Sequence, residues 1–185
     1  MLQDCLLHHC CAVCTPYVFT ALSDKYNVVS YWYNPNIYPD NEKENRKNAL
    51  ISYLTEYEIA FVCEDFDYDG FFATITQGLT RCEHCYLTRI NKTVNKAKEL
   101  KIKNFSTTLL ASPYQQHDFI KQYALKAAHE NGLNFIYSDF RPAFYKGKNI
   151  IKEKKLYSQK YCGCGISYGD YLIRKENKWE TSKIK

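Results

Sequence analysis

Long apolar segments are missing from this 185-residue sequence. No run approaches the ~18 residues that a membrane span requires. The first nine residues also lack the basic start and long apolar stretch of a secretory signal peptide, and the sequence has no internal repeat or low-complexity segment. A secreted protein, a membrane partner and a repeat array are therefore not expected, and the chain is predicted to be soluble and cytoplasmic.

Cysteine, in contrast, is abundant, with nine in the chain. In a cytoplasmic protein, clustered cysteines indicate metal binding or redox catalysis more than structural disulfides. Cys5 lies within a predicted strand and Cys63 directly follows another, so we expect both to be buried apolar side chains. The other seven form three groups: Cys10, Cys11 and Cys14; Cys82 and Cys85; Cys162 and Cys164.

The charge is unevenly distributed along the chain, which has a formal net charge of +5. Residues 141–185 contain twelve Lys or Arg and four Asp or Glu, a net charge of +8, so the preceding 140 residues carry −3. Such a basic block suits attraction to phosphates and counterion release on nucleic-acid binding. A solvated, lysine-rich tail would account for the charge equally well.

Strands and helices are predicted to alternate. Apolar runs rich in branched and aromatic residues predict five strands, at residues 4–9, 28–33, 59–62, 105–108 and 134–137. The intervening helices are predicted from Thr15 as N-cap with Pro16 at the first position, within 41–58, from near Cys82, and over about 117–131. This order predicts the α/β class, with an open, mostly parallel, Rossmann-like (HUP-like) sheet flanked by helices.

The length and the 45% hydrophobic content fit one globular domain. We place this domain at residues 1–170, followed by a polar, partly disordered C-terminal tail at 171–185. In open parallel sheets, ligands bind beyond the carboxyl ends of the strands. The segments that follow the strands are therefore predicted to share one edge: 9–14, 34–36, 109–113 and 139–141.

The cysteine pattern fits several kinds of site. Thiolates bind zinc and iron–sulfur clusters well because sulfur is soft and polarisable, so a zinc-stabilised RNA-binding module is one alternative. Zinc ribbons normally use spaced cysteine pairs, whereas Cys10 and Cys11 are adjacent, and seven thiols exceed the four that one zinc uses. A cluster with separate redox-active thiols explains the surplus better, since a Cys-Gly-Cys triplet can form a strained, labile disulfide. A metal-free thiol–disulfide oxidoreductase would not need two adjacent cysteines.

Five separated motifs, in this order, closely resemble those of the QueH family. They are LLHHCCAVC at 6–14, YNPNIYP at 33–39, RCEHCYLTR at 81–89, TTLLASP at 107–113 and YCGC at 161–164. The resemblance runs from about Leu6 to Gly165. His9 departs from the serine or small residue that family members commonly have before the cysteine pair. The glycine-rich phosphate loop of ATP users is absent after the first strand, so ATP use is not predicted.

This resemblance implies an epoxyqueuosine reductase, which reduces epoxyqueuosine at the tRNA anticodon wobble position to queuosine, the last step of queuosine biosynthesis, without cobalamin. It implies a redox-active disulfide between Cys162 and Cys164, and partners that are the modified tRNA and an external electron donor, not DNA. Cys14 is a candidate ligand of a second metal, a mononuclear iron. The ligands of a [4Fe-4S] cluster would be Cys10, Cys11, Cys82 and Cys85.

Removal of an epoxide oxygen also needs protons. Asp139 is the candidate catalytic acid, with Tyr145 and His9 as alternatives at the same predicted edge. Each has a plainer interpretation, because Asp139 could cap a turn, Tyr145 is one of 17 tyrosines, and His9 could pack against the sheet. Arg141, Tyr145 and Lys146 are the candidate tRNA contacts, since a splayed base needs stacking partners and basic groups near its phosphates.

Overall fold

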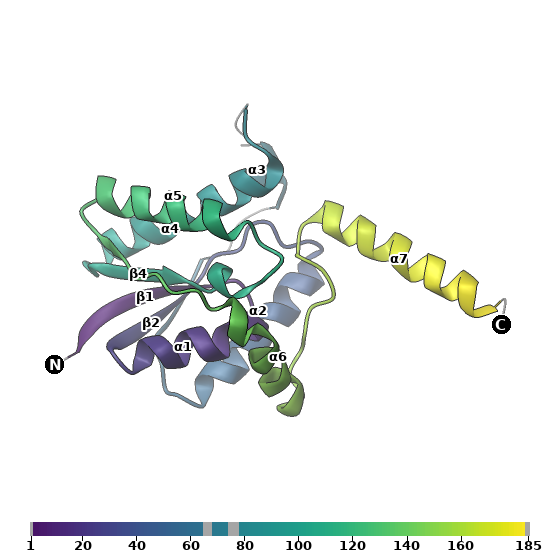
Figure 1. The fold of residues 1–185 in the computed structure, drawn as a ribbon, viewed down its shortest axis with the longest axis horizontal. Helices are drawn as coiled ribbons and strands as arrows, with labels where there is room; N and C mark the ends of the chain where they lie inside the picture. Colours follow the sequence, from purple (N-terminus) through teal and green to yellow (C-terminus); the bar gives the residue numbers. More distant parts are fainter. Residues whose placement is uncertain (1, 65–67, 74–77, 184–185) are drawn as a thin grey trace.

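The computed structural model describes residues 2–64, 68–73 and 78–183. Its centre is a single parallel sheet of five strands, in the order β3-β2-β1-β4-β5 (Figure 1). The strands are β1 (Gln3–His9), β2 (Tyr26–Trp32), β3 (Phe61–Cys63), β4 (Asn104–Thr107) and β5 (Asn134–Phe135). The predicted α/β class with an open parallel sheet is confirmed, and each predicted strand overlaps an observed one.

Helices cover both faces of the sheet (Figure 1). α4 and α5 lie on one face, and α1, α2 and α6 lie on the other. The helices of the described residues are α1 (Thr15–Ser23), α2 (Asp40–Thr55), α3 (Tyr68–Ala73), α4 (Arg81–Glu99), α5 (His117–Glu130), α6 (Phe144–Glu153) and α7 (Gly165–Lys183).

Helix α4 shows why the chain turns helical near the second cysteine group. Thr80 and Glu83 form a capping box, in which the Glu83 amide donates to the Thr80 hydroxyl at 3.2 Å and the Thr80 amide donates to the Glu83 carboxylate at 2.7 Å. Ile90, Val94 and Ala97 then recur on the buried face. Cys82 and Cys85 are thereby fixed in the first two turns of a capped and packed helix.

Two local expectations differ from the structure. Thr15 is the first residue of α1, not its N-cap, and its hydroxyl donates back to the carbonyl of Cys11 at 2.9 Å. Cys5 is fully buried in the central strand, as expected, whereas Cys63 is exposed. Cys63 ends the three-residue strand β3 at the edge of the sheet, where packing covers it less completely.

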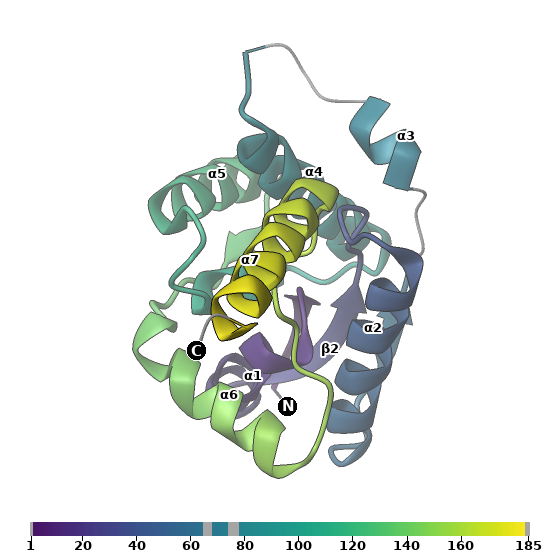
Figure 2. The ribbon, with the colours of Figure 1, turned by 90° about the vertical axis from the view of Figure 1, so that its right-hand side faces the viewer.

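The C-terminal segment is helical, which differs from the expected partly disordered tail after Tyr171. Helix α7 projects away from the sheet (Figure 1), and from the side it lies in front of the strand ends (Figure 2). Its first turns are held by Tyr168 and Tyr171, whose rings pack against Tyr161 with centroids at 5.3 and 5.7 Å, the first tilted and the second stacked. The outer turns are polar, as expected, and contain Arg, Lys and Glu, which are good helix formers.

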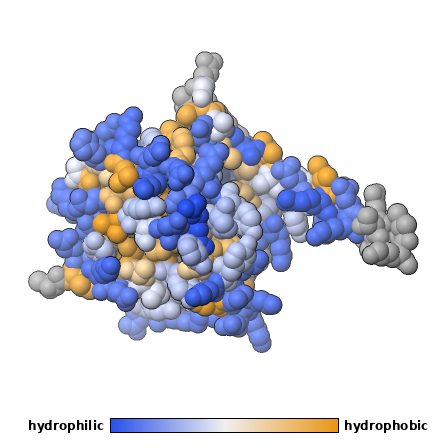
Figure 3. Space-filling view, in the orientation of Figure 1, coloured by the Kyte–Doolittle hydropathy of each residue, from blue (hydrophilic) through white to orange (hydrophobic). Residues whose placement is uncertain are grey.

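The molecular surface is mainly hydrophilic in the view of Figure 3, including most of the projecting α7. Among the residues that the structure describes, no helix combines the length and the apolar character needed to cross a bilayer.

Candidate functional site

A cavity of about 720 Å³ opens at the carboxyl edge of the sheet. Three of the four segments predicted to meet at this edge line it, those after β1, β2 and β4. Asp139 and Arg141, after β5, are not among its lining residues. The cavity also borders α7 and residues 158–162, which the strand-end rule did not predict.

Three cysteines converge on this cavity directly after β1. The Sγ atoms of Cys10, Cys11 and Cys14 all lie within 4.8 Å of one another, with 3.8 Å between the first two. An extended residue, Cys11, followed by the short 3₁₀ turn Ala12–Cys14 brings the third thiol back to the first two. This group has the geometry to hold a metal ion.

Buried polar contacts fix the backbone below these thiols. His9 is fully buried, with its ring nitrogens 2.9 Å from the Thr15 hydroxyl and 3.0 Å from the Ser30 hydroxyl. Burial lowers the pKa of His9 to about 3, so the ring is neutral at physiological pH. His9 therefore packs against the sheet and does not reach the cavity as a proton donor.

Hydrogen bonding within the triad favours a thiolate at its centre. The thiols of Cys10 and Cys14 hydrogen-bond to Cys11 and hold its pKa well below the usual value, with a smaller contribution from the positive charge of Arg46. The same bond to Cys11 raises the pKa of Cys10 to about 12. Gln159 also donates to the Cys11 sulfur at 2.9 Å. A thiolate is the form of cysteine that binds metal.

The remaining four cysteines of the three groups lie together in a neighbouring cavity. Cys82, Cys85, Cys162 and Cys164 line a space of about 20 Å³, and Asn36, Arg89, Gln115 and Cys162 line both this space and the larger one. Burial raises the pKa of Cys85 to about 11, which the charge of Arg89 partly offsets. Arg89 also donates to the Cys85 sulfur at 3.1 Å.

The structure thus divides the four expected cluster ligands between adjoining cavities. Cys10 and Cys11 lie with Cys14, and Cys82 and Cys85 lie with the Cys-Gly-Cys segment. Within the described residues, only the first triad meets the 4.8 Å spacing. The Asn36 Oδ1 atom, on the wall common to both cavities, is buried and has no hydrogen-bond partner among the described residues. The soft donor set and this unsatisfied oxygen fit a bound metal cofactor here.

The Cys-Gly-Cys segment is anchored by a buried arginine that the sequence did not single out. Arg46 donates to the carbonyls of Tyr161 and Cys162 at 2.9 and 3.0 Å, and its Nε pairs with Glu42 at 2.7 Å. Gly163 has φ +133°, and a Cβ there would lie 3.1 Å from the Arg46 guanidinium. Only glycine suits this conformation and this close approach. Cys162 and Cys164 are free thiols, the first exposed and the second buried.

The expected proton donor and tRNA contacts lie outside the cavity lining. Asp139 and Arg141 form a surface ion pair at 2.6 Å, and the hydrogen bond from Arg141 lowers the pKa of Asp139 to about 2. Asp139 is therefore ionised at neutral pH and has no proton to donate. Tyr145 and Lys146 are exposed on α6, where the Tyr145 hydroxyl lies 3.3 Å from that of Tyr114.

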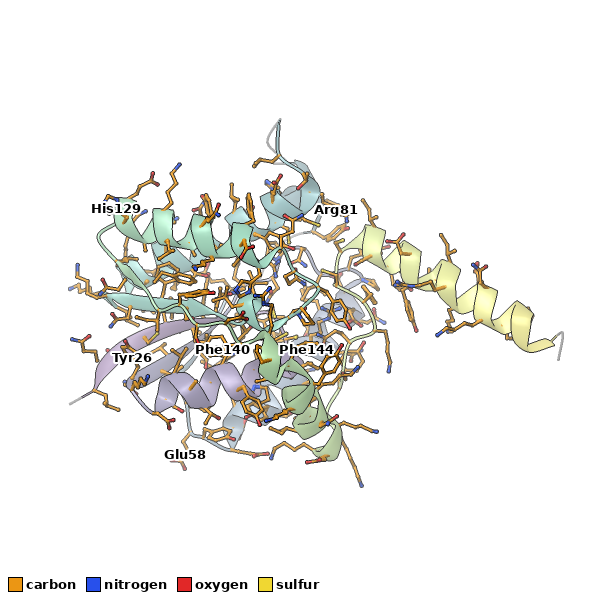
Figure 4. The ribbon with its side chains drawn as sticks, viewed as in Figure 1. Tyr26, Glu58, Arg81, His129, Phe140 and Phe144 are labelled. Atoms are coloured by element: carbon orange, nitrogen blue, oxygen red, sulfur yellow. The ribbon has the colours of Figure 1, made fainter. Side chains whose placement is uncertain are left out.

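Aromatic and basic residues form the cavity walls. Tyr114, Phe144 and Tyr161 line it together with Lys148 and Lys160. Figure 4 labels Phe144 at the start of α6 and Arg81 at the start of α4, where Arg81 lines the smaller cavity. The Arg81 guanidinium donates to the Cys82 sulfur at 4.0 Å, which places a cation beside the second thiol group.

Comparison with solved structures supports the α/β fold. The chain aligns with a U34-tRNA thiolase, NcsA from Methanococcus maripaludis with its [4Fe-4S] cluster, at a TM-score of 0.55 and 11% identity, covering 97% of this chain and 66% of that one. A deacetylase of the teicoplanin biosynthesis pathway gives a TM-score of 0.52 at 15% identity, covering 82% and 83%. At these identities the likeness concerns the fold alone.

Comparison with protein sequences is more specific. A protein of Dehalococcoides mccartyi named epoxyqueuosine reductase QueH is 34% identical over 90% of this chain and 93% of its own. Its namesake from Thermotoga maritima is 29% identical over 96% and 95%. The family model of epoxyqueuosine reductase QueH matches residues 5–170, which include all three cysteine groups. The chain therefore belongs to the epoxyqueuosine reductase QueH family.

Proposed function

We propose that this chain reduces epoxyqueuosine at the wobble position of a tRNA anticodon to queuosine. The observation that carries the proposal is the meeting of the family motifs around one cavity. Segments 10–14, 34–37, 109–115 and 158–162 are far apart in sequence and contribute residues to the same walls. The volume of about 720 Å³ lies within the range for sites that enclose a drug-sized molecule, and a modified nucleoside is of this size.

The cofactor in this proposal is a [4Fe-4S] cluster with Cys10, Cys11, Cys82 and Cys85 as its ligands. When bound, such a cluster supplies electrons one at a time. Arg89 supports the assignment, because its buried guanidinium donates to the Cys85 sulfur at 3.1 Å and also borders the larger cavity, which Cys10 lines. A single cation would thus stand beside thiolates of both groups once metal binding removes their protons. Cys14, the third thiol of the first triad, is the proposed ligand of a second metal, a mononuclear iron.

Cys162 and Cys164, called the thiol pair below, supply the reducing equivalents in this proposal. Loss of the epoxide oxygen as water, leaving an alkene, consumes two electrons and two protons. Cys162 and Cys164 release two electrons and two protons when their thiols form a disulfide, so the reaction balances. Cys162 borders both cavities and is exposed, whereas Cys164 is buried behind it. An external electron donor then reduces the disulfide.

The surroundings of the pair suit reversible disulfide formation. Arg46 holds the carbonyls of Tyr161 and Cys162, and the Tyr38 amide donates to the carbonyl of Gly163 at 2.8 Å. Ser167 accepts from the Gly163 amide at 3.1 Å. The backbone on each side of Cys162 is therefore fixed, and a disulfide across one residue in a fixed backbone is strained and readily reduced.

The test is reduction of epoxyqueuosine-containing tRNA by protein purified and reconstituted without oxygen, with nucleosides analysed by mass spectrometry. Cys162→Ser is the catalytic variant, and Cys63→Ser, which changes an exposed cysteine outside both cavities, is its matched control. We expect queuosine from the wild type and the control and at least a hundredfold less from Cys162→Ser. Stoichiometric zinc, no iron uptake and no queuosine would instead support the zinc-stabilised RNA-binding module.

A further inference from the structure

Helix α7 follows the thiol pair directly and extends from the mouth of the cavity. Its first residue, Gly165, comes immediately after Cys164, and the Tyr168 amide donates to the Cys164 carbonyl at 2.9 Å. Beyond Tyr171 its described side chains are exposed, and Figure 2 shows the helix standing in front of the strand ends. The core of the domain does not account for this part of the chain.

One side of α7 lines the cavity, and that side is basic. Successive lining positions are spaced by three, one, three, one and three residues, which places them on a single helical face. This face begins with polar residues next to the thiol pair and ends with three cations. Its members are Ser167, Asp170, Tyr171, Arg174, Lys175 and Lys178.

Further cations come from other segments of the chain. Lys148 of α6 and Lys160 of the segment before the thiol pair also line the cavity, so five exposed cations and one carboxylate, Asp170, surround the opening. Lys148, Lys160, Arg174 and Lys175 form no ion pair with any part of the chain that the structure describes. Unpaired cations around a cavity provide a favourable potential for an anionic ligand.

Aromatic rings lie among these cations. Tyr161 and Tyr171, both in the lining, stack with an interplanar angle of 23°, and Tyr114, which also lines the cavity, is 75% exposed. Rings interleaved with Lys and Arg are the combination that binds single-stranded nucleic acid, where bases stack and phosphates pair with cations. From Ser167 to Lys178 the helix covers about 16 Å, the reach of several consecutive phosphates.

We propose that the α7 face Arg174, Lys175 and Lys178, with Lys148 and Lys160, binds the phosphates of the RNA nucleotides that flank the base held in the cavity. This inference rests on the proposed function for the identity of the RNA, an anticodon loop. The three cations of α7, called the basic rail below, follow the polar residues next to the thiol pair and lead outward along the helix. The rail positions the strand so that one base enters the cavity while its neighbours stay outside on the helix.

The test compares two triple variants of the full chain with equal charge change. The rail variant is Arg174→Gln/Lys175→Gln/Lys178→Gln, and the control is Lys98→Gln/Lys103→Gln/Lys126→Gln, which alters exposed cations away from the cavity. The probe is a fluorescently labelled anticodon stem-loop RNA without the modification, titrated by anisotropy at several salt concentrations. Such binding requires no turnover, so the result does not depend on reductase activity.

We expect affinity on the order of tenfold lower for the rail variant, and a slope of log K against log salt that is shallower by about 2, because three contacts at about 0.7 each are lost. The control should match the wild type. Equal binding by both variants would overturn the inference, even if the enzyme reduces epoxyqueuosine. Normal RNA binding with impaired reduction by a protein electron donor would also overturn it and assign the face to that donor.

Discussion

The buried pair between Arg46 and Glu42 yields a sharp prediction about the thiol segment. Their side chains are 3% and 7% exposed and lie 2.7 Å apart, and Tyr157 also donates to Glu42. Replacing Arg46 with Leu removes the cation and leaves the carboxylate buried with only the tyrosine hydroxyl. Breaking a buried pair in this way costs about 3–5 kcal/mol. Each of the two carbonyls that loses its donor adds about 1–3 kcal/mol if water does not replace it.

Urea denaturation of the metal-free, reduced protein measures this cost. We expect Arg46→Leu to lower the free energy of unfolding by at least about 3 kcal/mol. Adding Glu42→Leu to that variant should recover part of the loss, because the uncompensated charge is removed. A cost below about 1 kcal/mol, as for exposed pairs, would refute the argument from burial. No recovery in the double variant would show that the carbonyls, rather than the buried charge, dominate.

Three further predictions concern the cysteines and the buried histidine. Cys82→Ala should lose cluster binding whereas Cys162→Ala should keep the iron and lose turnover, and equal iron loss in both variants would refute this division of roles. Burial lowers the pKa of His9 in the folded protein to about 3, whereas in the unfolded chain this pKa is near 6.5. Between these two pH values the unfolded chain therefore binds one proton more at His9 than the folded protein does. As a result, the free energy of unfolding falls as the pH decreases. Plotted against pH from 6 to 4, the free energy of unfolding of His9→Gln should therefore have a slope that is smaller than the wild-type slope by about 1.4 kcal/mol per pH unit. An unchanged slope would contradict the burial of His9. In metal-free reduced protein, alkylation followed by peptide mass spectrometry should modify the two exposed cysteines, Cys63 and Cys162, before the others and leave Cys5 intact, because Cys5 is fully buried and burial raises its pKa to about 12.

The fold was predictable because it follows from local patterns and a general topological rule. Apolar periodicity located the strands, and alternation with helices implied a parallel sheet whose carboxyl edge gathers the following segments. Cys10, Asn34 and Ser112 meet there as predicted. The strand ends shifted by one or two residues, because hydrogen bonding to a neighbouring strand, rather than side-chain type, decides where a strand stops.

Other parts of the site depend on contacts that no local pattern encodes. The contact of Glu42 with Tyr157 spans 115 residues, and that of Arg46 with Cys162 spans 116. In the sequence, Glu42 and Arg46 resemble an exposed pair on a charged helix, and only the arrival of residues 157–164 over α2 buries them. The same lack of long-range information left the cavity-facing side of α7 unrecognised, because that segment shows no apolar periodicity.

The surface position of Asp139 has a similar origin. The strand-end rule placed Asp139 at the correct edge, but β5 has only two residues and lies at the side of the sheet. The chain then turns away, and Asp139 pairs with Arg141 at the surface. Topology predicts which edge a segment reaches, whereas the orientation of its side chains depends on the turn that follows.

A single-turnover reaction tests the central claim most directly. Reconstituted protein with reduced thiols, freed of external reductant and kept without oxygen, is mixed with excess epoxyqueuosine-containing tRNA, and nucleosides and cysteines are analysed by mass spectrometry. The account predicts a wobble nucleoside lighter by one oxygen, at up to about one per chain, with an equal amount of Cys162–Cys164 disulfide. An unchanged nucleoside in protein that holds iron, or queuosine formed without oxidation of this pair, would contradict it.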